Sequence, residues 1–216
     1  MASFFQSLVL LAFSYLIIPQ LIITINALAV KPVDTTLGFV SLPLNLSYYH
    51  IQRPYDVPLN QRYSFIHGVH KCWVSQQTNL TFLPVKLNLG YASGIWQFEG
   101  HGYVPNGTSG VNIMQVFGAT PPRATTLMLS VQWVSGVLQH GSSPSAKHLQ
   151  RWFKLNVIHD VDAAKLKVYI DGYLKLEAKG RAGTSHAFKC GVYAQFNDSY
   201  YMESRWKHLK VLRKCD

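Results

Sequence analysis

The chain has 216 residues, 48% of them hydrophobic, which is enough for one domain with its own core. Its formal charge of +10, with a pI near 9.6, favours an acidic polysaccharide, a small carboxylate, a nucleic acid or a membrane surface as partner. No Lys/Arg cluster is denser than Arg213-Lys214 and no RNA-binding type of basic-aromatic motif occurs, which argues against nucleic acid. No Cys or His pair has zinc-ligand spacing within a wider cluster, so we expect no metal or other cofactor.

The first segment of the chain has the composition of a secretory signal peptide. Residues Leu8–Ile25 are almost wholly apolar, and Ala27-Leu28-Ala29 offers small residues at a cleavage position. We predict a signal peptide over residues 1–29 and one domain over 30–216: a monomer without stable membrane association, in the extracellular space, the cell wall or the vacuole. The alternative is a retained anchor, because Met1–Gln6 lacks Lys and Arg and the apolar run is long enough to span a bilayer. Four sequons fit an exported glycoprotein: Asn45, Asn79, Asn106 and Asn197.

The remainder of the chain has the pattern of β structure. Short alternating or β-branched runs recur between Gly, Pro, Asn and Ser, and there is no long stretch of period 3.6. Asp171-Gly172 predicts a hairpin turn of type I′ between Leu166–Ile170 and Tyr173–Ala178, because both turn positions need positive φ. Further strands are predicted at Trp96–Val104, Val111–Phe117, Thr126–Trp133, Trp152–Ile158, Phe188–Phe196 and Ser204–Leu212. So many strands in one chain indicate two stacked antiparallel sheets.

Two predicted strands present polar side chains in strict alternation. In Trp96–Val104 the residues Gln97, Glu99 and His101 share one face, opposite Trp96 and Phe98. The same parity in Val111–Phe117 places Gln115 together with Ile113 and Phe117, opposite Asn112, Met114 and Val116. Such polar faces are typical of a hydrated or ligand-facing surface.

The strand near the C-terminus carries the most chemistry. Lys189, Tyr193 and Gln195 share a face and supply a cation, a phenol and an amide. Gly191 lies between the lysine and the tyrosine, where a missing side chain would let a ligand approach the backbone. If the polar rows of these strands line one concave sheet, they form a groove suited to a sugar chain. The alternative is that one of the strands faces bulk water.

The three cysteines leave at least one thiol unpaired within a monomer. A bridge between Cys72 and Cys215 is conceivable, because the first and last strands of a sandwich often lie close together. Alternation places Cys190 on the apolar face of its strand, so we expect a buried structural thiol there.

The segment from Ala187 to Gln195 resembles the Tyr-Phe-Lys-Ala-Gly-x-Tyr-x-Gln signature of the alginate lyase 2 family, the jelly-roll polyuronate lyases. Five of its positions agree, while Ala187 and Cys190 stand where the signature has Tyr and Ala. Flanking segments resemble the plant citrate-binding proteins, which share that fold: Trp96 to Gly100, Ile113 to Gly118, Gly183 to His186 and Tyr201 to Lys207. The resemblance covers the chain after its apolar segment and implies an all-β, concanavalin-like jelly-roll sandwich of two antiparallel sheets.

The resemblance also implies a set of catalytic positions. Gln115 and Tyr193 stand where those lyases have their Gln and Tyr, but Phe117 occupies the His position. The Arg-rich strand of the family corresponds to Val85–Leu89, where Lys86 is the one basic residue. A polyuronate lyase must neutralise a carboxylate, remove the proton at C5 and protonate the leaving oxygen, and half of the groups for this are missing.

We therefore favour a secreted binding protein for a citrate-like carboxylate or an acidic polysaccharide. Its ligand would be held by Gln115, Tyr193, Lys189, Gln195, Gln97, Glu99, His101, Lys86 and Arg205. The alternative is a lyase that uses Tyr193 as acid and base, with Gln115 and Lys189 neutralising the substrate. A structural lectin of the cell wall without a compact site is a third reading. For Arg205, a surface ion pair with Glu203 is the alternative to ligand binding.

Overall fold

The computed structural model describes residues 31–215 apart from 46–47, 53, 55–56, 76–81, 88–89, 119–123, 133–136, 141–142, 148–149, 182–184 and 195–198. The predicted signal peptide, Asn79 and Asn197 lie outside the described residues. No helix of the described part is long and apolar enough to cross a membrane.

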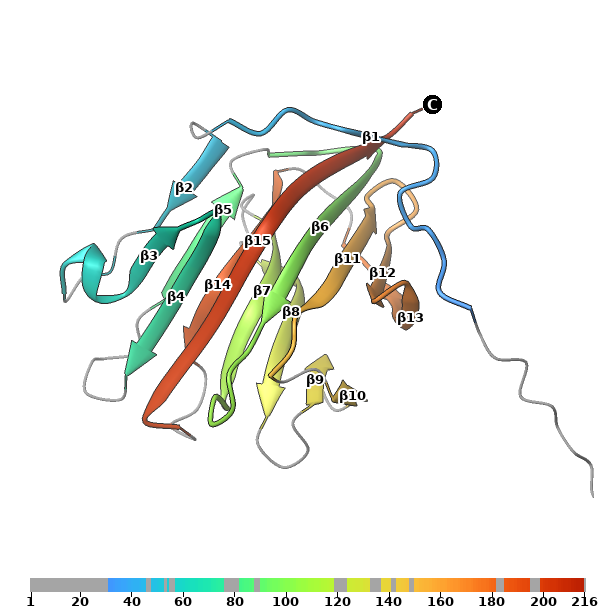
Figure 1. Ribbon diagram of the computed structural model, residues 1–216. Coiled ribbons are helices and arrows are strands. Elements are labelled where there is room, and N and C mark those ends of the chain that lie inside the picture. Colours follow the sequence, from blue (N-terminus) through green and yellow to red (C-terminus); the bar gives the residue numbers. More distant parts are fainter. Residues whose placement is uncertain are drawn as a thin grey trace, which may run out of the picture. The chain divides into compact units, whose positions relative to one another are not determined.

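Two antiparallel sheets form a sandwich, in agreement with the predicted jelly roll (Figure 1). Sheet A runs β13 (Tyr173–Lys179), β12 (Lys165–Ile170), β11 (Phe153–Asp160), β6 (Ile95–Tyr103), β15 (Tyr201–Lys214), β4 (Val69–Ser75) and β3 (Tyr63–Ile66), and β1 (Phe39–Ser41) pairs with the end of β15. Sheet B runs β10 (Ser143–Lys147), β9 (Val137–His140), β8 (Ala124–Gln132), β7 (Val111–Gly118), β14 (His186–Ala194), β5 (Phe82–Leu87) and β2 (Tyr49–Ile51). A 3-10 turn covers Leu59–Gln61.

The core lies between the inner faces of the two sheets. Phe98 on β6 packs against Phe188 on β14 and against Trp206 on β15, with ring centroids 6.0 and 5.8 Å apart. All three rings are buried, and β14 contacts β15 across the sandwich. The inner side chains are therefore used for packing, which leaves the outer face of each sheet for polar residues.

Gly102 on β6 makes room for two of the core rings. A Cβ at this position would lie 2.7 Å from Phe153 Cζ and 3.2 Å from Trp206 Cη2, and both rings are fully buried. We expect Gly102→Ala to lower the free energy of unfolding by about 1–3 kcal/mol in urea denaturation, because the rings have no space to move into. Gly90→Ala is the control, since its Cβ meets only the His186 carbonyl at 3.9 Å. Equal stability of both variants would contradict this packing.

The predicted strands are present, with bounds that differ by a few residues. The hairpin of β12 and β13 is confirmed, with φ of 53° at Asp171 and 80° at Gly172. The sequence pattern missed the first four strands, together with β9 and β10, most of which are short or lie toward the sheet edges. The fifth strand, β5, overlaps the strand that the resemblance placed at Val85–Leu89. The conceivable bridge between Cys72 and Cys215 is not formed, since the first thiol is buried in the core and the second is exposed. Cys190 is buried, as predicted.

Candidate functional site

The two predicted polar rows do not share a groove. Gln97, Glu99 and His101 belong to β6 of sheet A, whereas Gln115 and Lys189 belong to β7 and β14 of sheet B. The inner faces of β6 and β14 pack on each other, so the two rows lie on opposite outer faces. The single-groove prediction is therefore wrong. Alternation defines which residues share a face of a strand, but the chain crosses from sheet A to sheet B between β6 and β7.

The sheet B row is aligned by strand register. Gln115 lies opposite Lys189 on one side and opposite Met128 on the other, and Lys189 lies opposite Lys86 of β5. One level of the sheet thus brings together residues of four strands. The next level places Asn112 opposite Tyr193. Gln195 lies outside the described residues.

A bulge in β7 adds Asn112 to this face. The register with β8 shifts between Asn112 and Met114, so Ile113 and Met114 are both buried in the core. The parity prediction that Ile113 lies with Gln115 is wrong for this reason. Asn112 instead accepts a hydrogen bond from Ser130 Oγ, and its Nδ2 lies 3.4 Å from Met128 Sδ. The adjacent apolar pair Ile113-Met114 is the signal in the sequence that breaks strict alternation.

Lys189 is held as a fixed cation. Its side chain is only 8% exposed, and its Nζ lies 3.8 Å from the centroid of the Phe117 ring. A cation over an aromatic face is attracted by the ring quadrupole, more strongly where water is excluded. The phenyl ring at position 117 therefore places the ammonium group on the site face.

Gln115 presents an acceptor on the same face. Its Nε2 donates to Thr125 Oγ1 at 2.6 Å, while its Oε1 is buried and has no hydrogen-bond partner among the described residues. A buried amide oxygen without a partner is costly, so the site is suited to a ligand hydroxyl that donates to it.

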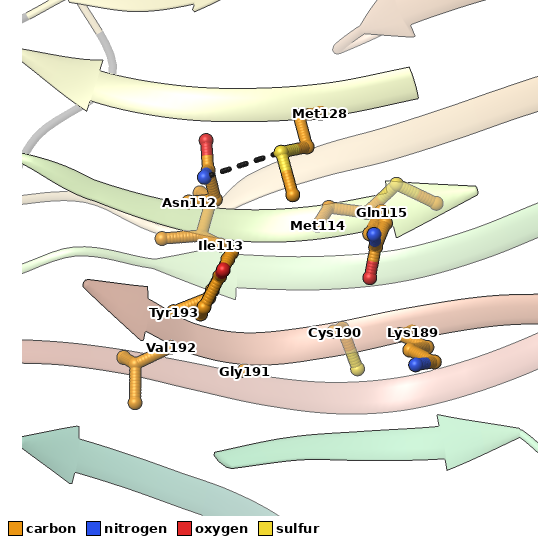
Figure 2. A pocket seen from close by; sticks show the side chains of 10 residues that line it. All are labelled: Asn112, Ile113, Met114, Gln115, Met128, Lys189, Cys190, Gly191, Val192 and Tyr193. Carbon is orange, nitrogen blue, oxygen red and sulfur yellow. Dashed lines mark hydrogen bonds between the residues drawn. The ribbon is translucent and has the colours of Figure 1, made fainter. Parts of the chain in front are cut away.

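A small, open depression lies over Gly191, between Lys189 and Tyr193 (Figure 2). Its lining includes Asn112, Gln115 and Met128. Gly191 has a φ of 146°, where a side chain would be strained, and its carbonyl accepts a hydrogen bond from Ser204 Oγ of β15 at 2.6 Å. Glycine is therefore the residue that the backbone conformation at this position favours.

The remaining predicted site residues have partners on the outer face of sheet A. Glu99 is buried, which works to raise its pKa, but hydrogen bonds from Lys154, Lys210 and Asn156 outweigh burial and lower the pKa to about 2. Glu99 and its three partners lie on the far side of the core from Lys189. Each of the others also has a local contact there: Gln97 donates to Thr35 Oγ1, His101 packs edge-on against His208, and Arg205 pairs with Glu203 at 2.5 Å.

The fold and this face define a jelly-roll scaffold of the kind found in polysaccharide lyases. AlgAT5, an alginate lyase from polysaccharide lyase family 7, has the same fold with a TM-score of 0.57 at 14% identity, over 80% of this chain and 87% of that chain. The alginate lyase from Corynebacterium sp. has a TM-score of 0.54 at 12% identity, over 69% of this chain and 80% of its own.

The chain belongs to the alginate lyase family, whose model matches residues 44–213. It is also 40% identical over 191 residues to the citrate-binding protein of Hevea brasiliensis, which covers 83% of this chain and 79% of that protein. Both resemblances inferred from the signature strand and its flanking segments are confirmed.

Proposed function

We propose that this protein binds a citrate-like carboxylate or the uronate unit of an acidic polysaccharide on the outer face of sheet B, without cleaving it. The name of the Hevea relative supports a carboxylate ligand, and the names of the structural neighbours support an acidic polysaccharide. The apolar segment Leu8–Ile25 and the sequons support a place in the secretory pathway, in the cell wall or the vacuole.

The contact between Lys189 and Phe117 is the observation on which this proposal rests. By the family resemblance, position 117 corresponds to a histidine, which exchanges protons and donates hydrogen bonds. A phenyl ring does neither, and here it supports an ammonium group instead. A side chain able to transfer protons is thus replaced at position 117 by one that attracts the Lys189 ammonium group. In the proposed complex, Lys189 pairs with the ligand carboxylate and Gln115 accepts from a ligand hydroxyl.

A lyase is the second candidate, because Tyr193 is retained. It lies on the same face as Lys189, opposite Asn112, at the edge of the depression over Gly191. In that mechanism its phenolate would take the C5 proton and its phenol would protonate the departing oxygen, while the lysine neutralised the carboxylate.

Ultraviolet absorbance distinguishes the two functions. We expect a flat trace when the protein is incubated with polymannuronate, polyguluronate or glucuronan, because no base stands at position 117. Citrate should raise the melting temperature of the same preparation, and Tyr193→Phe should reduce that shift only modestly. A sustained rise in absorbance that Tyr193→Phe abolishes would mean that the protein is a lyase.

A further inference from the structure

The outer face of sheet A, which Figure 1 shows in front of sheet B, carries a second set of polar side chains. Among the described residues, three of its aromatic rings have a cation over them. Lys71 Nζ lies 5.1 Å from the Trp73 ring centroid, Arg205 Cζ lies 5.2 Å from that of Tyr103, and Lys207 Nζ lies 4.2 Å from that of Trp152. We call these six residues the cation–aromatic face.

The register arranges part of this face in one row. Arg205 of β15 lies opposite Tyr103 of β6 on one side and opposite Lys71 of β4 on the other. The rings of Tyr103 and Trp152 are neighbours, with centroids 5.6 Å apart. Strands in a sheet are about 4.8 Å apart, so successive groups in the row are separated by close to the length of one pyranose unit.

Buried carboxylates hold two cations of this face in place, together with two further lysines on the outer face of sheet A. Glu203 is 3% exposed and pairs with Lys71 at 3.1 Å and with Arg205 at 2.5 Å. Glu99, 4% exposed, pairs with Lys154 and Lys210, each at 2.9 Å. Cations fixed in this way lose little freedom when they bind an anion.

These ion pairs leave the face positive. Each carboxylate is shared between two cations, and Lys207 adds a further charge over Trp152. The cations also remain accessible, since the side chain of Arg205 is 40% exposed and that of Lys210 is 51% exposed. Burial works to raise the pKa of Glu203, but hydrogen bonds from Tyr201, Arg205 and Lys71 outweigh it and lower the pKa, so the pairs persist in mild acid.

We propose that the cation–aromatic face binds an acidic polysaccharide that carries carboxylates on its sugar rings. Rings of half-buried aromatic residues pack against the apolar faces of sugars, and the neighbouring cations pair with the carboxylates. A row of such groups across neighbouring strands suits a polymer rather than a single small acid. This site is separate from the one on sheet B and does not rest on the function proposed there.

Retardation in a native gel that contains sodium polygalacturonate tests the inference. The Trp152→Ala/Lys207→Gln variant should be retarded about tenfold more weakly than the unmodified protein. The matched control is Tyr173→Ala/Lys175→Gln, which removes a similar exposed cation–aromatic pair, 5.4 Å apart, from the edge strand β13. This control should behave as the unmodified protein does.

Three results would overturn the inference. Equal weakening in both double variants would mean that only net charge attracts the polymer, and no weakening in either would place the polymer elsewhere. Finally, the protein could sediment with phosphatidylserine vesicles through Trp152 and Lys207 and show no retardation by the polymer. This result would make the face a membrane-binding surface.

Discussion

Lys189→Met is expected to weaken citrate binding by about 100-fold in titration calorimetry. Its ammonium group is a cation that the structure places on the sheet B site, over the Phe117 ring and beside the depression at Gly191. Removing one member of a desolvated charge pair costs at least about 2 kcal/mol of binding free energy, and tenfold in affinity corresponds to about 1.4 kcal/mol.

The substitution to methionine keeps the packing of this position. A thioether against the Phe117 ring replaces the ammonium contact, so the melting temperature without ligand should change little. Lys165→Met is the control, because Lys165 is exposed on β12 of sheet A and should leave citrate affinity unchanged. Unaltered citrate binding in Lys189→Met would exclude the proposed site on sheet B while leaving the cation–aromatic face untested by that result.

Acid is expected to destabilise the fold between about pH 6.5 and pH 4. Burial lowers the pKa of His70 to about 4; it also lowers that of His159 to about 4, with a further contribution from neighbouring His186. Their usual value is 6.5, so between these two pH values the unfolded chain binds more protons than the folded one. Above pH 6.5 these two histidines therefore do not lower the free energy of unfolding. As the pH drops to about 4, the free energy of unfolding falls by on the order of 3 kcal/mol for each histidine.

His159 is the more testable of the two. Its Nδ1 lies 3.0 Å from Tyr91 Oη and its Nε2 lies 3.2 Å from the Arg181 carbonyl oxygen, so both ring nitrogens are engaged. His159→Gln should flatten the dependence of the unfolding free energy on pH by up to about 1.4 kcal/mol per pH unit, as measured by urea denaturation. The control is His67→Asn, because His67 is exposed with a φ of 50° that asparagine tolerates. A slope unchanged in His159→Gln would contradict the expected titration.

The sequence was most informative where a prediction depended on the alternation within a single strand. Alternation along β14 placed Lys189 and Tyr193 on a polar face and Cys190 in the core, and the structure agrees. Alternation failed where the position of a side chain depended on how its strand pairs with neighbouring strands. The bulge at Ile113 moved Asn112 onto the site, and no local pattern specifies which sheet β6 joins. The contact of Lys189 with Phe117 is also non-local, since Phe117 lies opposite Ala187 in the register.

The opposite orientation of the two polar faces bears on valency. The sheet B site and the cation–aromatic face are separated by the whole hydrophobic core, so one molecule offers two outward surfaces for anionic ligands. A single short glycan segment reaches one of them only. If both faces bind polymer, one protein molecule joins two polysaccharide molecules. The protein would then act as a cross-link between them, and the extent of cross-linking would depend on the ratio of protein to polysaccharide.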